Sequence, residues 1–348
     1  MVTPLVMQTF ALGAQWPTID PFLFVAHHKD DYPNANSELG PDADLSERSL
    51  GQDFSARDGW SMYHGADVPG FPQHPHRGFE TVTHVRRGVI DHADSLGATA
   101  RFGHGDTQWM TAGRGVQHSE MFPLTETTSP NPMEMFQIWV NLPATQKMVD
   151  PYFTMFWNER TPRLRTVDQD GAATEVTVIA GELGGLQPQT PPPDSWASDP
   201  DSDLAIWHIK IDPNGRWTLP AASSDLTKGV LYAFADSTVR IGGAEISAGT
   251  GAVLDRSHPA ELVAGPDGIE CVLLQGRPID EPVARYGPFV MNTNDEIHDA
   301  ISDYQSTQFG GWPWPDAAPN HGADADRFAI HADGRREQPI SRSPAAPR

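Results

Sequence analysis

Two short stretches of the sequence carry most of its structural information, HPHRGFET at residues 74–81 and HSEM at residues 118–121. Each contains two potential metal ligands separated by one residue, a His-x-His pair in the first and a His-x-Glu pair in the second. Alternate residues of a β-strand point to the same face, so each pair can direct two ligands toward one point. Two such strands facing each other would form a site of three imidazole nitrogens and one carboxylate.

The ligand types limit the metals that this site could hold. His74, His76 and His118 offer imidazoles, Glu120 offers a carboxylate, and no thiolate belongs to the set. Such a set suits Fe(II), Mn(II), Co(II), Ni(II) or Cu(II), and the sequence does not choose among them. A single histidine is more often a surface or core side chain, but two matched pairs arise less easily by chance. The sequence therefore predicts a metal site with positions left open for a substrate oxygen and O₂.

The rest of the chain is typical of short strands joined by turns. Its 31 glycines and 32 prolines are spread along the sequence rather than gathered in one tract. Between Phe79 and Asp106, apolar and polar residues alternate in short pieces, as in the half-buried antiparallel strands of a barrel or sandwich. A second strand-rich block begins at Leu204. The proline-rich stretch 187–203 is expected to be an exposed loop, and the pattern at 293–309 predicts a helix.

The composition excludes several classes of function. The 348 residues include 24 Lys and Arg against 46 Asp and Glu, a net charge of −22 that would repel nucleic acid and anionic lipid. The single cysteine, Cys271, excludes an intramolecular disulfide and a thiolate metal cluster. No run approaches the ~18 apolar residues needed to cross a bilayer. We therefore expect a cytoplasmic protein without a direct nucleic-acid ligand and without membrane association.

Further motifs accompany the two ligand pairs. They are QWMTAGRG at residues 108–115, WVNL at 139–142 and GPFVMNT at 287–293. The first ligand pair also fits the first half of the cupin metal motif, which continues to Glu80 and Gly88, whereas the second half departs from the usual spacing. Together these motifs resemble the pirin family, and the resemblance covers roughly residues 8 to 310.

The resemblance implies a fold and a division into domains. The fold would be all-β and bicupin, with two face-to-face antiparallel β-barrels of the cupin or jelly-roll type and a short C-terminal helix. Residues 1–160 would form the metal-binding barrel, and residues 161–310 would form a metal-free barrel that includes the helix near 293–309. The remaining 311–348 would be an extended or poorly ordered tail.

The resemblance also implies the roles of the site residues. His74, His76, His118 and Glu120 would bind one ion in the first barrel, most often Fe(II), with Mn, Co, Ni, Cu or Zn as alternatives. Glu80 would be a nearby carboxylate outside the ligand set, with either a proton-handling or a structural role. Glu80 is six residues from His74, so the two side chains would share a face if the strand stayed regular.

Two functions from different classes follow from the resemblance. Some pirins are similar to quercetin 2,3-dioxygenases, oxidoreductases that open the heterocycle of a flavonol or a related enolic substrate with O₂. In that case Glu120 or Glu80 would take the proton of the substrate hydroxyl. Other pirins resemble regulatory proteins in which the redox state of the metal controls binding to a protein partner. The acidic surface would suit a basic partner, and it serves solubility equally well. A monomer is expected in either case.

Overall fold

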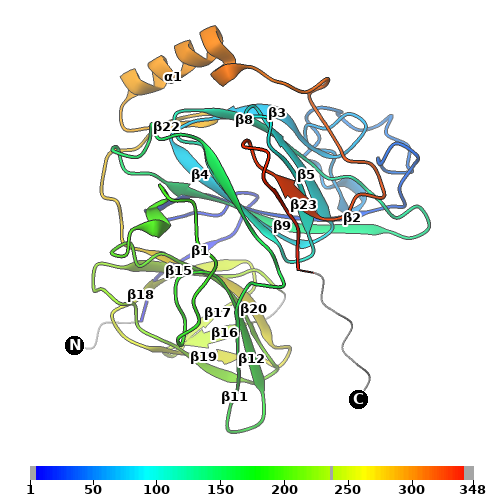
Figure 1. Cartoon of the computed structure of the whole chain (residues 1–348). Helices are drawn as coiled ribbons and strands as arrows, with labels where there is room; N and C mark the ends of the chain where they lie inside the picture. Colours follow the sequence, from blue (N-terminus) through cyan, green and yellow to red (C-terminus); the bar gives the residue numbers. More distant parts are fainter. Residues whose placement is uncertain (1–4, 236–237, 341–348) are drawn as a thin grey trace. The chain divides into compact units, whose positions relative to one another are not determined.

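The computed structural model describes residues 5–235 and 238–340 and contains two compact units built almost entirely from strands (Figure 1). Each unit is assembled from three separate segments of the chain. Unit 1 comprises Met1–Ala26, Ile138–Pro143 and Arg160–Glu281. Unit 2 comprises His27–Gln137, Ala144–Glu159 and Pro282–Arg348.

Unit 1 contains two antiparallel sheets. The seven-stranded sheet has the order β1 (Val6–Ala11), β18 (Thr250–Asp255), β15 (Lys228–Ala233), β20 (Ile269–Gly276), β13 (Ala205–Ile211), β12 (Ala173–Ala180) and β11 (Arg163–Val167). The four-stranded sheet has the order β14 (Arg216–Leu219), β19 (Ala260–Ala264), β16 (Val239–Ile241) and β17 (Ala244–Ile246).

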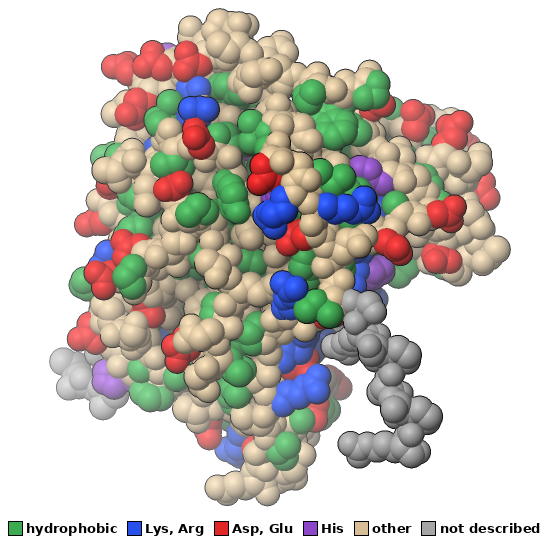
Figure 2. Space-filling model, in the orientation of Figure 1, with side chains coloured by type: hydrophobic (Ala, Val, Ile, Leu, Met, Phe, Trp, Pro, Cys, Tyr) green, Lys and Arg blue, Asp and Glu red, His purple; other side chains and the backbone are tan. Residues whose placement is uncertain are grey.

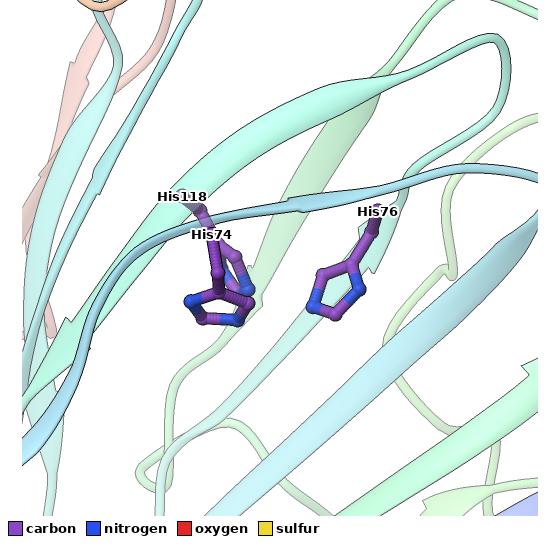
Figure 3. A group of neighbouring side chains, drawn as sticks. All are labelled: His74, His76 and His118. Atoms are coloured by element: carbon purple, nitrogen blue, oxygen red, sulfur yellow. The ribbon is translucent and has the colours of Figure 1, made fainter. Parts of the chain in front are cut away.

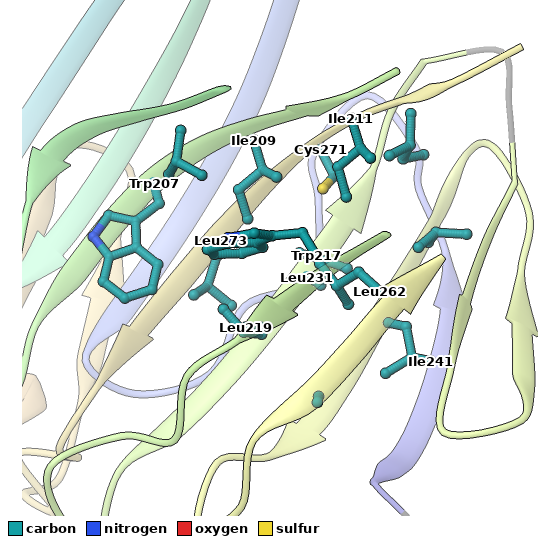
Figure 4. Packing of buried hydrophobic residues seen from close by; sticks show 14 of the residues in the cluster. Trp207, Ile209, Ile211, Trp217, Leu219, Leu231, Ile241, Leu262, Cys271 and Leu273 are labelled. Atoms are coloured by element: carbon teal, nitrogen blue, oxygen red, sulfur yellow. The ribbon is translucent and has the colours of Figure 1, made fainter. Parts of the chain in front are cut away.

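Alternate side chains of both sheets form one buried apolar core in unit 1 (Figure 4). Trp207 and Ile209 of β13 contribute from the larger sheet, and Leu219 and Leu262 contribute from the smaller one. Period-two alternation places these residues on the inner faces, and burying each large apolar side chain contributes roughly 1.5–3 kcal/mol. The interior of unit 1 is therefore filled by its own side chains.

Unit 2 also contains two larger sheets, together with a short hairpin. The six-stranded sheet has the order β24 (Arg336–Glu337), β23 (Phe328–Ile330), β6 (Thr99–Gly103), β5 (Val89–Asp94), β8 (Val116–Met121) and β3 (Gly70–His76). The five-stranded sheet has the order β10 (Tyr152–Phe156), β7 (Thr107–Thr111), β4 (Phe79–Arg87), β9 (Asn131–Asn141) and β2 (Phe22–Tyr32), and the ends of β2 and β9 extend into the residues of unit 1. The hairpin pairs β21 (Ala284–Tyr286) with β22 (Phe289–Met291).

Helix α1 (Asn294–Thr307) confirms the helix predicted at 293–309. Thr293 accepts a hydrogen bond from the Glu296 backbone N–H, and the Glu296 carboxylate accepts one from the Thr293 N–H. This reciprocal capping box satisfies two backbone donors at the helix start. Acidic side chains gather over α1 (Figure 2), and two of them, Asp295 and Glu296, lie in its first turn, where the helix dipole favours negative charge.

The boundaries between the units differ from those expected from the sequence. Strand β1 belongs to unit 1, where it pairs with β18 and places Thr9 opposite Ala252. Residues 282–310, with α1, belong to unit 2 rather than to the second barrel. Both assignments depend on pairings between segments far apart in the chain, which local composition does not reveal. The all-β class with a C-terminal helix is confirmed.

The tail was expected to be extended or poorly ordered, and its described part is instead packed on unit 2. Strand β23 pairs with β6, placing Ala329 opposite Ala100. The buried Arg101 makes a bidentate ion pair with Asp91, and its guanidinium also donates to the Gly322 and Ala325 carbonyls. A buried guanidinium whose hydrogen bonds are not satisfied is costly, and the tail carbonyls accept two of the hydrogen bonds of Arg101. These contacts therefore hold the tail in place. Residues 341–348 lie outside the described residues.

Some of the loops are long, such as residues 33–69, which join β2 to β3. The 3₁₀ turns are η1 (Arg57–Gly59), η2 (Trp196–Ser198) and η3 (Gln308–Gly310). The stretch 187–203 is a loop as predicted, but it is only partly exposed, because Trp196 is buried and donates its ring N–H to the Arg277 carbonyl. Among the residues described, no helix combines the length and the apolar character needed to span a membrane.

The turn between β3 and β4 requires glycine at position 78. Gly78 has a φ of +84°, and a Cβ atom there would lie 2.0 Å from the Val290 carbonyl oxygen. Gly97 has a nearly equal φ of +82° but has nothing within 4 Å of its Cβ position. We expect Gly97→Ala to cost only the backbone strain of roughly 1–2 kcal/mol, and Gly78→Ala to lower the melting temperature by several degrees more. Equal melting temperatures for the two variants would contradict the predicted overlap.

Candidate metal centre

The antiparallel pairing of β3 with β8 brings the two ligand pairs together. His74 lies opposite His118 in the register, and Phe71 lies opposite Glu120. The register shifts between Phe71 and His74, so these two residues, three apart, share one face where a regular strand would place them on opposite faces. Their rings are 6.4 Å apart between centroids. The strand irregularity thus directs both Phe71 and the histidines to the same side of the sheet.

The shared face is the inner face of unit 2. His118 and Glu120 lie between Val116 and Phe122 at every second position of the chain. Val116 and Phe122 both belong to the buried apolar cluster of this unit. Residues of one parity on a strand share a face, so the ligands project into the same interior. The candidate centre therefore lies among apolar side chains rather than on the surface.

Three histidines converge on one point in this interior. One ring nitrogen from each of His74, His76 and His118 lies within 4.8 Å of the other two. The ring centroids are 4.4 Å apart for His74 and His118 and 4.9 Å apart for His76 and His118. Figure 3 shows all three rings extending from β3 and β8 toward the same space. The structure thus brings together the three predicted imidazole ligands.

Hydrogen bonds orient two of the three rings. His74 Nδ1 lies 2.8 Å from the Pro72 carbonyl oxygen, so this nitrogen carries the proton and donates it. The Pro288 carbonyl accepts a hydrogen bond from the His76 ring. Metal-binding histidines commonly donate their other N–H to a carbonyl in this way, which fixes the ring and its tautomer. Neither ring nitrogen of the buried His118 has a hydrogen-bond partner among the described residues, as expected of a ring prepared to bind another group.

Burial keeps the three imidazoles neutral. It lowers the pKa of His74 to about 4 and lowers the pKa of His76 and His118 well below the ordinary value for histidine. The charge of neighbouring histidines lowers these pKa values further. A neutral imidazole is the form that binds a metal, so the donor set fits a divalent transition-metal ion at neutral pH.

Glu120 lies next to this cluster but is not one of the donors that converge within 4.8 Å. Its carboxylate is fully buried and accepts hydrogen bonds from the Thr83 hydroxyl at 2.9 Å and from the Gln137 amide at 2.8 Å. Burial raises the pKa of Glu120, and the two hydrogen bonds oppose this effect. The carboxylate is therefore held in place by two neighbouring strands, β4 and β9. Its ligation of a metal stays a prediction.

Glu80 does not share the face of His74, as it would on a regular strand. The chain turns at Gly78 between β3 and β4, so the alternation of β3 does not continue to Glu80. Within β4, Glu80 and Thr83 are three residues apart and point to opposite faces, and Thr83 is the one that contacts Glu120. The buried Glu80 carboxylate instead accepts a hydrogen bond from Thr111 at 2.7 Å. A proton-handling role for Glu80 stays a prediction.

Sequence reasoning missed several residues around the cluster. Thr83 and Gln137 hold Glu120, and His92 of β5 lies opposite Glu120 in the β5–β8 register. One signal for His92 was available, because His92-Ala93-Asp94 repeats the His-x-acid spacing of the second ligand pair. The role of Thr83 and Gln137 could be found only from the pairing of strands distant in sequence.

The two histidines of unit 1, His208 and His258, have ordinary partners. His208 Nε2 lies 2.7 Å from the Glu270 carboxylate. His258 is exposed, and its Nδ1 lies 2.8 Å from the Ser257 hydroxyl. Neither belongs to a group of converging ligands among the residues that the structure describes.

Comparison with known proteins identifies the architecture around this centre. The Pirin family model matches residues 5–140, and the Pirin C-terminal cupin domain matches residues 206–310. A Pseudomonas aeruginosa protein provisionally named as a quercetin 2,3-dioxygenase is 37% identical over 242 residues, which is 69% of this chain and 79% of that protein. Human pirin is 34% identical over 255 residues, which is 71% of this chain and 80% of pirin.

A solved structure shares the fold at lower sequence identity. The structure of quercetin 2,3-dioxygenase from Acinetobacter baumannii superimposes with a TM-score of 0.70 at 24% identity, covering 89% of this chain and 99% of that one. Both halves of the chain match pirin models, and the His-x-His and His-x-Glu pairs lie within the first of them. This chain therefore belongs to the pirin family.

Proposed function

We propose that this protein is a metal-dependent dioxygenase that opens the heterocycle of a flavonol, or acts on a related enolic substrate, with O₂. The observation that carries the proposal is the convergence within 4.8 Å of three neutral imidazoles, the half-buried His74 and the buried His76 and His118, next to a buried carboxylate. The names of relatives at 37% and 36% identity, both provisionally quercetin 2,3-dioxygenases, support this reaction class. An aromatic substrate with vicinal oxygens is the ligand class that such a centre would accept.

His74, His76, His118 and Glu120 would hold the metal. The family resemblance favours Fe(II), and the imidazole and carboxylate donors are equally compatible with Mn, Co, Ni, Cu or Zn. When bound, such an ion supplies positive charge that favours a deprotonated oxygen ligand and a centre at which O₂ can react.

The side chains around the cluster would perform the remaining steps. The Glu120 carboxylate, held by Thr83 and Gln137, would accept the proton of the substrate hydroxyl at one of its oxygens. Phe71, which shares the face of His74, would pack against the flat substrate ring. The apolar side chains that surround the ligands, such as Phe122, would exclude water from the reacting atoms.

The first test concerns the ligands themselves. We expect wild-type protein to bind one equivalent of transition metal per chain, and His76→Ala and His118→Ala each to lose most of it while keeping the wild-type circular dichroism. The fold should survive because unit 2 has its own apolar core. His258→Ala, which changes an exposed histidine, is the control and should keep the metal. Two equivalents in the wild type, or unfolding of both site variants, would contradict the assignment.

The second test separates the two carboxylates. Glu120→Gln replaces an anionic donor with a weak neutral one, so metal affinity measured by competition with a chelator should fall strongly. Glu80→Gln should keep the metal, because Glu80 lies on the face of β4 opposite to Thr83, the residue that contacts Glu120. In metal-replete Glu80→Gln, a rate loss of about 10²-fold would support its proton-handling role, and an unchanged rate would assign the proton to Glu120. Loss of metal only in Glu80→Gln would overturn the proposed ligand set.

The third test concerns the reaction. Iron-loaded protein incubated with quercetin in air should remove the flavonol absorbance and release carbon monoxide, and the His118→Ala variant should do neither. A metal-replete wild type that leaves quercetin and other enolic flavonols unchanged would exclude flavonol cleavage. That result would favour the alternative function, metal-controlled binding to a protein partner.

A further inference from the structure

The buried histidine of β5, His92, is the strongest polar feature of unit 2 that the proposed reaction does not use. It lies opposite Glu120 in the β5–β8 register, and directly opposed residues of an antiparallel pair point to the same face. Its ring centroid is 5.5 Å from that of His118. The side chain is fully buried. His92 therefore projects into the same interior as the candidate ligands.

Neither ring nitrogen of His92 has a hydrogen-bond partner among the described residues. The nearest carboxylate oxygen, Asp94 Oδ2, lies 3.5 Å from Nε2 without hydrogen-bond geometry. The other oxygen of Asp94 accepts from the backbone N–H groups of Leu96 and Ala98. Each buried polar atom without a partner costs roughly 1–3 kcal/mol, so the fold accepts a penalty at this position.

Packing alone does not account for a histidine here. The His92 ring contacts Phe153 edge-on, with 5.3 Å between the ring centroids. Ile90, two residues before His92 on β5, and Phe102, the partner of Ile90 on β6, are buried apolar residues. A phenylalanine or leucine at position 92 would fill this space without an unsatisfied polar atom. An imidazole carries at least one N–H in either protonation state, so His92 always offers a donor to whatever occupies the centre.

We propose that His92 is a ligand-binding residue that donates a hydrogen bond to an oxygen or other acceptor atom of the small molecule bound beside His74, His76 and His118. In the proposed reaction, which this inference deepens, the acceptor is an oxygen of the enolic substrate. His92, on β5, would then fix the orientation of the substrate. Glu120, on β8, would accept the proton of the substrate hydroxyl. His92 is not itself a metal ligand in this assignment.

The test compares two substitutions. His92→Phe removes the donor but keeps a ring against Phe153, and His92→Gln keeps an N–H donor. Two probes are used, quercetin with zinc-loaded protein, followed by its absorbance shift, and azide with cobalt-loaded protein, followed by the visible spectrum. We expect His92→Phe to keep the metal content and to weaken both probes about tenfold, near the value of one well-placed hydrogen bond. His92→Gln should bind within about threefold of the wild type, a partial rescue that a purely structural role would not produce.

A matched control is available on β4. His84 is also buried, but its ring bonds to Thr107, and its parity places it on the face of Glu80. His84→Phe should leave both probe affinities unchanged, whatever it does to the melting temperature. Unchanged affinities in His92→Phe, or loss of metal from that variant, would overturn the proposal. If wild-type protein binds azide but not quercetin, the proposed substrate class fails, while the azide affinities still decide the role of His92. Binding of neither probe would overturn both.

Discussion

The site of this protein depends on the antiparallel pairing of β3 with β8, including its single irregularity. The register places His74 opposite His118 and Phe71 opposite Glu120. A one-residue slip in a strand would turn its side chains to the other face of the sheet. The register is fixed because Val116 of β8 and Phe122, which directly follows this strand, are buried in the apolar core. The hydrophobic pattern of β8 thus also sets the position of the ligands.

The turn that follows His76 is held by segments distant in the sequence. Lys147 is buried, and its ammonium group donates hydrogen bonds to the carbonyls of Gly78 and Val290. The Pro288 carbonyl accepts from the His76 ring, and Val290 donates its N–H to the Arg77 carbonyl. The GPFVMNT motif at 287–293 therefore belongs physically to the first ligand pair, although more than half of the chain separates them.

The two units show how one architecture supports different interiors. In unit 1 the inner faces carry apolar residues such as Ile209 and Leu231, and close packing fills the space. In unit 2 the inner face of β8 carries His118 and Glu120 next to the apolar Val116, and Thr83 and Gln137 supply hydrogen bonds to the carboxylate. Polar groups in an apolar interior are stable only when they are satisfied, and these side chains could be satisfied by a bound ion.

The sequence by itself determined the local features of this protein. The His-x-His and His-x-Glu spacings predicted three converging imidazoles, and the pattern at 293–309 predicted α1, because strand alternation and helical spacing act over a few residues. The sequence motifs around the two ligand pairs also identified the pirin family. The spacing of Glu120 to His118 predicted a fourth ligand, which stays a prediction.

Only the tertiary structure decided which distant segments meet. It placed β1 with β18, packed the tail on β6 through Arg101, and brought the Thr83 hydroxyl of β4 to the Glu120 carboxylate of β8. It also brought His92 opposite Glu120 through the β5–β8 register. These outcomes depend on long-range strand pairing, whose free energy comes from the burial of both partners together, so neither segment alone contains the information that determines the pairing.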